Sequence, residues 1–202
     1  ASGVELFLHT STAWVYGRDG GAGTTEGSPY RISQDLYIDT KIEAERGLQQ
    51  LCRAGLPLVI VQPSQVYGPN DRHWTLTPLR LIQAGQMILV NGGSGLIQPI
   101  YVDDVVAGIL SAAQHGRIGE AYLLCGPESM PIRQYYSELG KMLGRKSIPS
   151  LPGWLALAAA SLLERLSTFT KKQPTFTVAS VRGNLIHTSY SGRKAQDELG
   201  FF

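Results

Sequence analysis

The sequence lacks several features that mark whole classes of protein. It has only two cysteines, Cys52 and Cys125, which stand far apart in apolar surroundings without the spacing of a metal site. We therefore expect buried free thiols, a reducing cytoplasmic environment and no bound metal. The first residues do not combine a charged segment with an apolar run, so no secretory signal is predicted.

The chain also lacks an excess of charge of either sign. Its 202 residues include 18 lysines and arginines and 16 aspartates and glutamates, which give a net charge of +2. This balance gives no electrostatic reason to expect binding to nucleic acid or to an acidic membrane surface. The hydrophobic content of 43% is enough for a core, and the length suits one domain with or without a small lobe.

Two short segments carry most of the chemical information. Residues 4–8 form a short apolar run that predicts a buried strand, and residues 11–17 (Ser-Thr-Ala-Trp-Val-Tyr-Gly) place hydroxyl groups directly after it. Ligand sites in open α/β sheets form at the carboxyl ends of strands. Ser11 and Thr12 are therefore candidate site residues, although Thr12 alone is also explained as a cap at the end of a strand.

The second segment is a predicted helix that begins at Tyr37, because residues 37–46 contain good helix formers and neither proline nor glycine. Tyr37 and Lys41 are four residues apart and therefore share one face of the helix. An ammonium group beside a phenol favours the phenolate, and such a tyrosine can exchange a proton with a substrate hydroxyl or carbonyl near neutral pH. A pair at this spacing also occurs by chance on ordinary exposed helix faces.

The rest of this helix predicts one apolar side and one solvent-facing side. The apolar side is formed by Ile42, Ala44, Leu48 and Leu51. The solvent-facing side is expected to hold Glu43, Glu45 and Arg46. Gly55 is expected to end the helix. Tyr30, which precedes the helix, has no lysine four residues further on, so we expect it to cover the site or to pack on it.

Together, the two segments resemble the extended short-chain dehydrogenase/reductases. That family includes the NAD-dependent epimerases and dehydratases, the 3β-hydroxysteroid dehydrogenases and the dihydroflavonol reductases. It combines Tyr-x-x-x-Lys with a strand that ends in Ser-Thr-x-x-Val-Tyr-Gly, at a separation similar to that between Thr12 and Tyr37. The resemblance implies that Tyr37 is the general acid/base, that Lys41 supports it and binds the nicotinamide ribose, and that Thr12 orients the substrate oxygen. The implied cofactor contacts also include Ser11, and the implied substrate contacts also include Ala13 and Gln98.

A second stretch extends the resemblance. The apolar run 58–61 predicts a buried parallel strand, and residues 62–69 (Gln-Pro-Ser-Gln-Val-Tyr-Gly-Pro) predict a rigid turn after it. The family has a matching strand and turn, in which the backbone after the proline faces the nicotinamide amide. By resemblance, the wall on the nicotinamide side is formed by Pro63, Ser64, Gln65 and Val66. Gln62 stands where the family often has arginine, and a purely structural turn is the alternative.

The substrate region departs from the nucleotide-sugar branches of the family. Those enzymes commonly use an arginine at the position of Ile97 to grip a diphosphate, which an isoleucine cannot do. Asp103 and Asp104 precede a helical pattern over 105–113, and we expect them to cap that helix rather than to act in catalysis. The change at Ile97 favours an apolar, steroid-like or flavonoid-like substrate, with a nucleotide sugar as the alternative.

Residues 151–166 form a predicted apolar helix in which Glu164 and Arg165 are the charged residues. The segment is too short to span a bilayer comfortably. One interpretation is a buried or dimer-packing helix. The others are an apolar lid over a hydrophobic substrate and an element that contacts a membrane surface.

The resemblance also has a gap. The family fold begins with a strand, a glycine-rich turn and a helix that bind the cofactor pyrophosphate, and no Gly-x-x-Gly-x-x-Gly follows a strand here. The glycines of residues 17–27 are followed by no helical pattern and predict an active-site loop. The chain also begins without methionine. We therefore expect a fragment, or a gene that has lost its start, which lacks about the first third of a typical member.

The expected fold is α/β: part of a Rossmann-like, doubly wound parallel sheet with a small C-terminal substrate lobe. Residues 1–202 are expected to form one domain, with the lobe mainly over 70–100 and 127–190. The implied function is hydride transfer with NAD or NADP at a secondary alcohol or ketone of a small molecule, by a homodimer. An epimerase would use the same residues. The rival from another class is a non-catalytic fragment or interaction module.

Overall fold

A computed structural model describes residues 3–17, 21–33, 35–145, 147–170, 176–185 and 187–201. Residues 18–20 of the glycine-rich stretch lie outside the described residues. The chain divides into two compact units, of which the first is Ala1–Asp71, Gln98–Ser129 and Thr188–Phe202, and the second is Arg72–Ile97 and Met130–His187. The second unit occupies most of the residues expected for a substrate lobe, and substrate binding by it stays a prediction.

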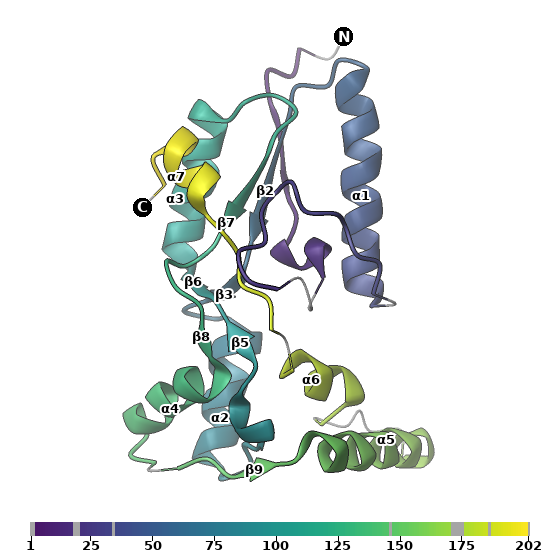
Figure 1. Cartoon of the computed structure of the whole chain (residues 1–202), viewed down its shortest axis with the longest axis vertical. Helices are drawn as coiled ribbons and strands as arrows, with labels where there is room; N and C mark the ends of the chain where they lie inside the picture. Colours follow the sequence, from purple (N-terminus) through teal and green to yellow (C-terminus); the bar gives the residue numbers. More distant parts are fainter. Residues whose placement is uncertain are drawn as a thin grey trace. The chain divides into compact units, whose positions relative to one another are not determined.

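The first unit is built on a parallel sheet of three strands in the order β1-β2-β7. The strands are β1 (Phe7–Thr10), β2 (Leu58–Pro63) and β7 (Ala121–Leu124). Figure 1 shows α1 (Leu36–Arg53) on one face of this sheet, and α3 (Val102–His115) with α7 (Arg193–Leu199) on the other. Helices on both faces of a parallel sheet confirm the predicted α/β class.

The alternation of side chains along β7 shows how the sheet supports two separate cores. Tyr122 and Leu124 point into the core beneath α3 and α7, whereas Leu123 and Cys125 belong to the core beneath α1. Successive residues of a strand point to opposite faces, so a continuous apolar run suits a sheet that is covered on both sides. The central strand β2 is buried at every position.

Helix α1 has the extent that its sequence predicts. It begins after Asp35, whose side chain accepts a hydrogen bond from the backbone N–H of Tyr37, and it ends at Arg53, just before the predicted stop at Gly55. Its buried face includes Ile38 and Ile42, which pack in the core beneath α1, whereas Leu51, expected on the same side, is 56% exposed and that expectation is wrong. The apolar spacing therefore fixes which side of the helix faces the sheet.

Two predicted boundaries differ from the structure. The first strand begins at Phe7 rather than near residue 4, because its pairing with β2 starts where Phe7 meets Leu58. Helix α3 begins at Val102, so Asp103 and Asp104 lie inside its first turn and neither is the N-cap. The prediction that these two residues cap the helix is wrong, although their charges still face the positive end of the helix dipole.

The Val-Tyr-Gly sequence occurs twice in the first unit, and both glycines adopt positive φ. The first copy ends a short 3-10 helix, η1 (Ala13–Tyr16), and the second follows β3 (Gln65–Tyr67), which pairs with β6 (Pro99–Tyr101). Gly17 has a φ of 87° and Gly68 a φ of 147°. A Cβ at Gly17 would lie 2.8 Å from the Arg31 side chain, so both conformation and space require glycine there.

The second unit consists of short elements around two small cores. Its helices are η2 (Arg72–Leu76, a π-helical turn), α2 (Thr77–Gln83), η3 (Asn91–Gly93), α4 (Ile132–Met142), α5 (Gly153–Thr170) and α6 (Val178–Gly183). Its strands are β4 (Leu89–Val90), β5 (Leu96–Ile97), β8 (Met130–Pro131) and β9 (Ser150–Leu151). One core joins α2 to α4, and the other joins β4, α5 and α6.

Helix α5 is the predicted apolar helix, but it spans Gly153–Thr170 instead of residues 151–166. Its small residues Ala156 and Ala160 pack inwards against Val90 and Val181, and Gly153 is buried as well. Over the part of the chain that the structure describes, no helix has the length and hydropathy needed to cross a bilayer. The side of α5 opposite these small residues remains exposed.

Both cysteines are free thiols, as expected. Cys125 is buried, and burial raises the pKa of its thiol to about 12. Cys52 is only partly buried, which is less than its apolar surroundings in the sequence suggested.

The two cores predict a large contrast between two leucines. Leu124 is fully buried in β7, whereas Leu110 on α3 is 59% exposed. We expect Leu124→Ala to lower the free energy of unfolding by about 2–5 kcal/mol because it leaves a cavity, and Leu110→Ala to change it by less than about 0.5 kcal/mol. Urea unfolding of the two variants measures the difference. Equal losses would contradict the assignment of the core.

Candidate functional site

The predicted site residues come together at the carboxyl end of β1 and the beginning of α1. Ser11 and Thr12 follow β1 directly, and Tyr37 and Lys41 lie in the first two turns of α1. Helix α1 packs on η1 through Ile38 and the residues around Ala13. The first unit therefore has candidate residues where an open α/β sheet forms its ligand sites.

Lys41 and Tyr37 each contact a residue that is close in sequence to the Ser11-Thr12 pair. The Nζ atom of Lys41 donates a hydrogen bond of 3.0 Å to the carbonyl oxygen of Thr10. The ring of Tyr37 meets the ring of Trp14 edge-on, with centroids 6.4 Å apart. The lysine is thus attached two residues before Thr12 and the tyrosine two residues after it. Tyr37 is 50% exposed, so its hydroxyl can be reached from solvent.

Thr12 has the capping role that was its alternative explanation. It is the N-cap of η1, and its Oγ1 accepts a hydrogen bond of 3.3 Å from the backbone N–H of Trp14. This bond uses an acceptor site of the hydroxyl and leaves the proton of Thr12 free to be donated. The cap therefore fixes the orientation of the side chain and is compatible with a role in binding an oxygen atom.

Ser11 has a buried hydroxyl with an unused hydrogen-bonding capacity. The residue is 5% exposed, and its Oγ has no hydrogen-bond partner among the described residues. Its backbone N–H donates a hydrogen bond of 2.8 Å to the carbonyl oxygen of Val61. A buried hydroxyl without a partner costs about 1–3 kcal/mol. The position suits a polar group supplied from outside this part of the chain.

The segment expected to form the nicotinamide-side wall is held from within the protein. Ser64 donates from Oγ to the carbonyl oxygen of Gln98, at 2.6 Å, and from its N–H to Leu124, at 2.9 Å. Gln65 accepts from the N–H of Gln98 at 3.0 Å, and Pro63 is the buried last residue of β2. These bonds make the turn rigid. Val66 is partly buried against the core beneath α3.

Two of the residues predicted to contact substrate, Ala13 and Gln98, have structural roles in the first unit. The methyl group of Ala13 is fully buried in the core beneath α1. The side chain of Gln98 donates to the carbonyl oxygens of Gly126 (2.7 Å) and Tyr190 (3.1 Å) and accepts from the N–H of Tyr190 (2.8 Å). Gln98 therefore links three segments of the first unit, a role that explains its amide without a substrate.

A buried polar network that the sequence did not indicate lies next to this site. Glu45 was expected in solvent with Glu43 and Arg46, but it is fully buried, and that prediction is wrong. The Nε2 atom of Gln62 donates to both of its carboxyl oxygens, at 3.0 and 2.9 Å, and the hydroxyl of Tyr30 donates to one of them at 2.6 Å. The spacing is the signal that was available, because Glu45 is four residues after Lys41 and three after Ile42.

The network also includes two of the tyrosines near the site. The hydroxyl of Tyr16 donates to Oε1 of Gln62 at 2.8 Å, and the ring of Tyr16 packs on that of Tyr30. Burial, more than any other cause, raises the pKa of both Tyr16 and Tyr30. Both phenols therefore keep their protons. Tyr30 packs on Tyr16 within this network, and a role for it in covering the site stays a prediction.

His9 is a titratable group on β1 that the sequence did not single out. Its Nε2 atom is buried without a hydrogen-bond partner among the described residues. Burial lowers the pKa of His9, the nearby charge of Lys41 lowers it further, and the charge of Glu45 acts in the opposite direction. The site thus contains a histidine that is held towards its neutral form.

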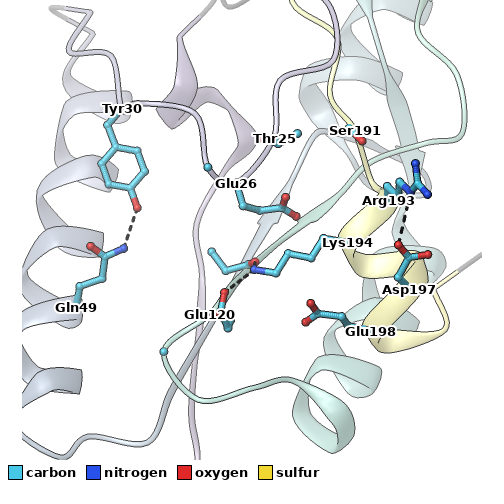
Figure 2. Close-up of a pocket in the computed structure, with 13 residues that line it drawn as sticks. Thr25, Glu26, Tyr30, Gln49, Glu120, Ser191, Arg193, Lys194, Asp197 and Glu198 are labelled. Carbon is cyan, nitrogen blue, oxygen red and sulfur yellow. Dashed lines mark hydrogen bonds and ion pairs between the residues drawn. The ribbon is translucent and has the colours of Figure 1, made fainter.

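A polar pocket of about 650 Å³ lies beside the start of β7 and the first turn of α7, and Tyr30 of the Glu45 network is among the residues that line it. Figure 2 shows Lys194 directed at Glu120, and Arg193 beside Asp197. Lys194 also lowers the pKa of Glu120 by its hydrogen bond. The carboxylate of Glu26, which also lines the pocket, accepts the N–H of Leu123 at 2.8 Å. Because these charged groups have partners within the chain, we assign no ligand to this pocket.

The Glu45 network predicts a large effect on stability. Glu45→Ala removes the carboxylate that accepts hydrogen bonds from Gln62 and Tyr30 in a dry interior. We therefore expect the free energy of unfolding to fall by about 2–5 kcal/mol. The matched control is Glu43→Ala, which removes only an exposed ion pair with Arg46 and should cost less than about 1 kcal/mol. Chemical unfolding followed by circular dichroism distinguishes them. Similar losses for both would show that the network does not hold α1.

The lowered pKa of His9 predicts how stability depends on pH. Below the ordinary value of 6.5 the unfolded chain binds the proton more readily than the folded chain. The contribution of neutral His9 is therefore complete above pH 6.5 and is lost as the pH falls through the folded pKa. We expect His9→Gln to lose less stability than the unaltered chain between about pH 7 and about pH 5, measured by urea unfolding. The same loss in both proteins would contradict this account.

The comparisons with known proteins agree with this geometry. Residues 1–125 match the NAD dependent epimerase/dehydratase family. Over 219 residues the chain is 29% identical to 3beta-hydroxysteroid-dehydrogenase/decarboxylase isoform 1 of Arabidopsis thaliana, covering 98% of this chain and 50% of that protein. It is 29% identical over 210 residues to a putative dihydroflavonol 4-reductase of Synechocystis sp., covering 98% and 60%. The chain thus spans about half to three fifths of the length of these relatives.

The fold of this chain also resembles that of solved structures. The crystal structure of DesIV, a dTDP-glucose 4,6-dehydratase from Streptomyces venezuelae with NAD and TYD bound, superposes with a TM-score of 0.75 at 22% identity. The match covers 99% of this chain and 55% of that one. A likeness at this identity shows the fold alone. The family match covers more than half of the chain, and the chain therefore belongs to the NAD-dependent epimerase/dehydratase family of extended short-chain dehydrogenase/reductases.

Proposed function

We propose that this chain carries the catalytic half of an NAD(P)-dependent oxidoreductase or epimerase that acts at a secondary alcohol or ketone. One observation carries the proposal: Lys41 is hydrogen-bonded to Thr10 and Tyr37 contacts Trp14, so both catalytic candidates lie against the segment that contains Thr12. Family membership supports it. The whole protein is longer in the relatives, and the activity of this chain is accordingly a proposal.

The three residues have distinct roles in the proposed reaction. Thr12 donates the proton of its capped hydroxyl as a hydrogen bond to the substrate oxygen. Tyr37 exchanges a proton with that same oxygen, as a general acid in reduction and a general base in oxidation. Lys41, held at the end of β1 by its hydrogen bond to Thr10, is the residue that would bind the nicotinamide ribose. A nicotinamide cofactor, when bound, supplies or accepts the hydride.

The residues present fit the nicotinamide half of NAD or NADP. Ser11 offers a buried hydroxyl that has no partner among the described residues. The rigid turn over residues 63–66, fixed through Gln98, offers a backbone wall that would not need to reorganise on binding. The sequence has no glycine-rich turn for the pyrophosphate, so we assign no residue of this chain to that part of the cofactor.

We propose an apolar substrate of the steroid or flavonoid kind. Relatives at 29% identity are named for hydroxysteroid and dihydroflavonol substrates, and Ile97 offers no donor for a diphosphate. Ile97 is also 1% exposed, within the core that joins α2 to α4. The second candidate is a nucleotide sugar, which is favoured by a dTDP-D-glucose 4,6-dehydratase of Mus musculus at 31% identity over 70% of this chain.

A homodimer is the proposed assembly. Leu36 and Leu51 on α1 are 80% and 56% exposed, and both lie on the side of the helix that faces away from the sheet. Covering these side chains against a second copy would remove apolar surface from water. The family often pairs through this helix, which supports the proposal.

Tyr37→Phe tests the catalytic assignment in the full protein. Removing the hydroxyl should lower kcat by about 10²- to 10⁴-fold, because the proton transfer loses its donor. NADH and NADPH binding, followed by nicotinamide fluorescence, should stay nearly unchanged. The control is Tyr101→Phe, because Tyr101 precedes α3 without a side-chain cap bond.

Two results would contradict parts of this proposal. Full turnover by the Tyr37→Phe variant would remove Tyr37 from its role. A well-folded chain of these 202 residues that binds neither dinucleotide would favour the non-catalytic fragment or interaction module as the function of this chain alone.

A further inference from the structure

The two units of the chain carry opposite charge. The second unit has ten lysines and arginines and only two acidic residues, a net charge of +8, whereas the first has eight and fourteen, a net charge of −6. The overall charge of +2 conceals this division. The argument from net charge against an acidic membrane surface therefore fails for the second unit, because a local excess of charge determines electrostatic attraction.

The same unit exposes an apolar ridge on α5. Trp154, Ala158, Leu162 and Leu166 follow one another at intervals of four residues, and all four are exposed. The exposed fraction is 73% for Trp154, 59% for Leu162 and 50% for Leu166. Residues at this spacing form a continuous row along one side of a helix. A buried helix is therefore not what the structure has, whereas a dimer-packing helix, an apolar lid and a membrane-surface element all stay predictions.

The charged residues of α5 are divided between its two sides. Glu164 is partly buried, and its carboxylate accepts the N–H of Val178 at 2.8 Å, which attaches it to the start of α6. Arg165 is exposed beside the apolar ridge. Arg182 on α6 is exposed as well, and α6 packs against α5 through Val181. The described part of α5 thus presents tryptophan, leucine and the single cation Arg165 at its exposed side, with its carboxylate turned inwards.

This combination favours a lipid surface over the other occupants of an apolar face. An interfacial helix places tryptophan and leucine towards the lipid with basic residues beside them. Among the described residues, no helix is long and apolar enough to span a bilayer. Clustered basic residues add attraction to anionic headgroups. A nucleic acid would explain the charge but not the leucine row. An apolar protein partner would explain the row but not a charge of +8.

We propose that the second unit docks on an anionic lipid bilayer through α5. Trp154, Leu162 and Leu166 enter the boundary between headgroups and acyl chains, with Arg165 and Arg182 near the headgroups and the net positive charge of the unit adding long-range attraction. The docking itself does not depend on the proposed reaction. If the substrate is apolar, docking would let the enzyme collect it from the bilayer, and this consequence alone rests on the proposed function.

The direct test is cosedimentation with vesicles of phosphatidylcholine, with and without about 30 mol% phosphatidylserine. We expect binding to the anionic vesicles to be at least tenfold tighter, and to weaken as salt is raised because the charges are screened. Tryptophan emission should shift to shorter wavelength on binding, and Trp154→Phe should remove most of that shift while keeping most of the binding.

A pair of matched variants separates the α5 ridge from a general effect of charge. Leu162 on α5 and Leu110 on α3 are each 59% exposed, and a glutamate at either position adds one negative charge. Leu162→Glu should weaken binding to anionic vesicles at least tenfold, whereas Leu110→Glu should change it less than about threefold. Both sites are exposed, so both variants should fold, which circular dichroism checks.

Three outcomes would overturn the proposal. The first is equal, salt-independent binding to both kinds of vesicle. The second is unchanged vesicle binding by Leu162→Glu. The third is that the chain binds neither vesicle and Leu162→Glu converts a dimer into a monomer in sedimentation velocity, in which case a second copy covers α5. NADH titration of the same variants reports separately on the proposed function.

Discussion

The buried carboxyl group of Glu45 is the constraint on which the arrangement of the site depends. It accepts hydrogen bonds from β2, through Gln62, and from the segment before α1, through Tyr30, while Gln62 in turn accepts from Tyr16 at the end of η1. Apolar contacts such as those of Ile38 tolerate small shifts, whereas hydrogen bonds in a dry interior lose most of their energy when they are displaced. The network therefore fixes the register in which Tyr37 and Lys41 face the end of β1.

Much of the fold could be predicted because its signals are local. The apolar run of β2, the spacing along α1 and the glycine after it each follow from nearby residues. The errors occur where distant residues decide. Glu45 was assigned to solvent because a charged residue among charged neighbours usually lies there, and only its meeting with Gln62 and Tyr30 reverses this. The start of β1 is set by its pairing with β2. The opposite charges of the two units do not show in the net charge of the whole sequence, because they largely cancel.

The candidate site was predictable in its identity and less so in its details. The spacing of Thr12, Tyr37 and Lys41 is a sequence property, and the structure holds the segments that carry these residues together through Thr10 and Trp14. The directions of the other side chains are not sequence properties. The side-chain amide of Gln98 donates hydrogen bonds to the carbonyl oxygens of Gly126 and Tyr190. These segments are distant in sequence and lie beside Gln98 only in the folded chain.

The position of β1 in the sheet has a consequence for how this chain behaves by itself. β1 pairs with β2 on one side, and no strand among the described residues pairs with its other side. An open strand edge accepts almost any extended peptide, because main-chain groups recognise one another without regard to side chains. Lys41 covers one carbonyl of β1, that of Thr10. A segment that adds a strand beside β1 would therefore protect that edge, and without one, self-association of this chain through the edge would rise with concentration.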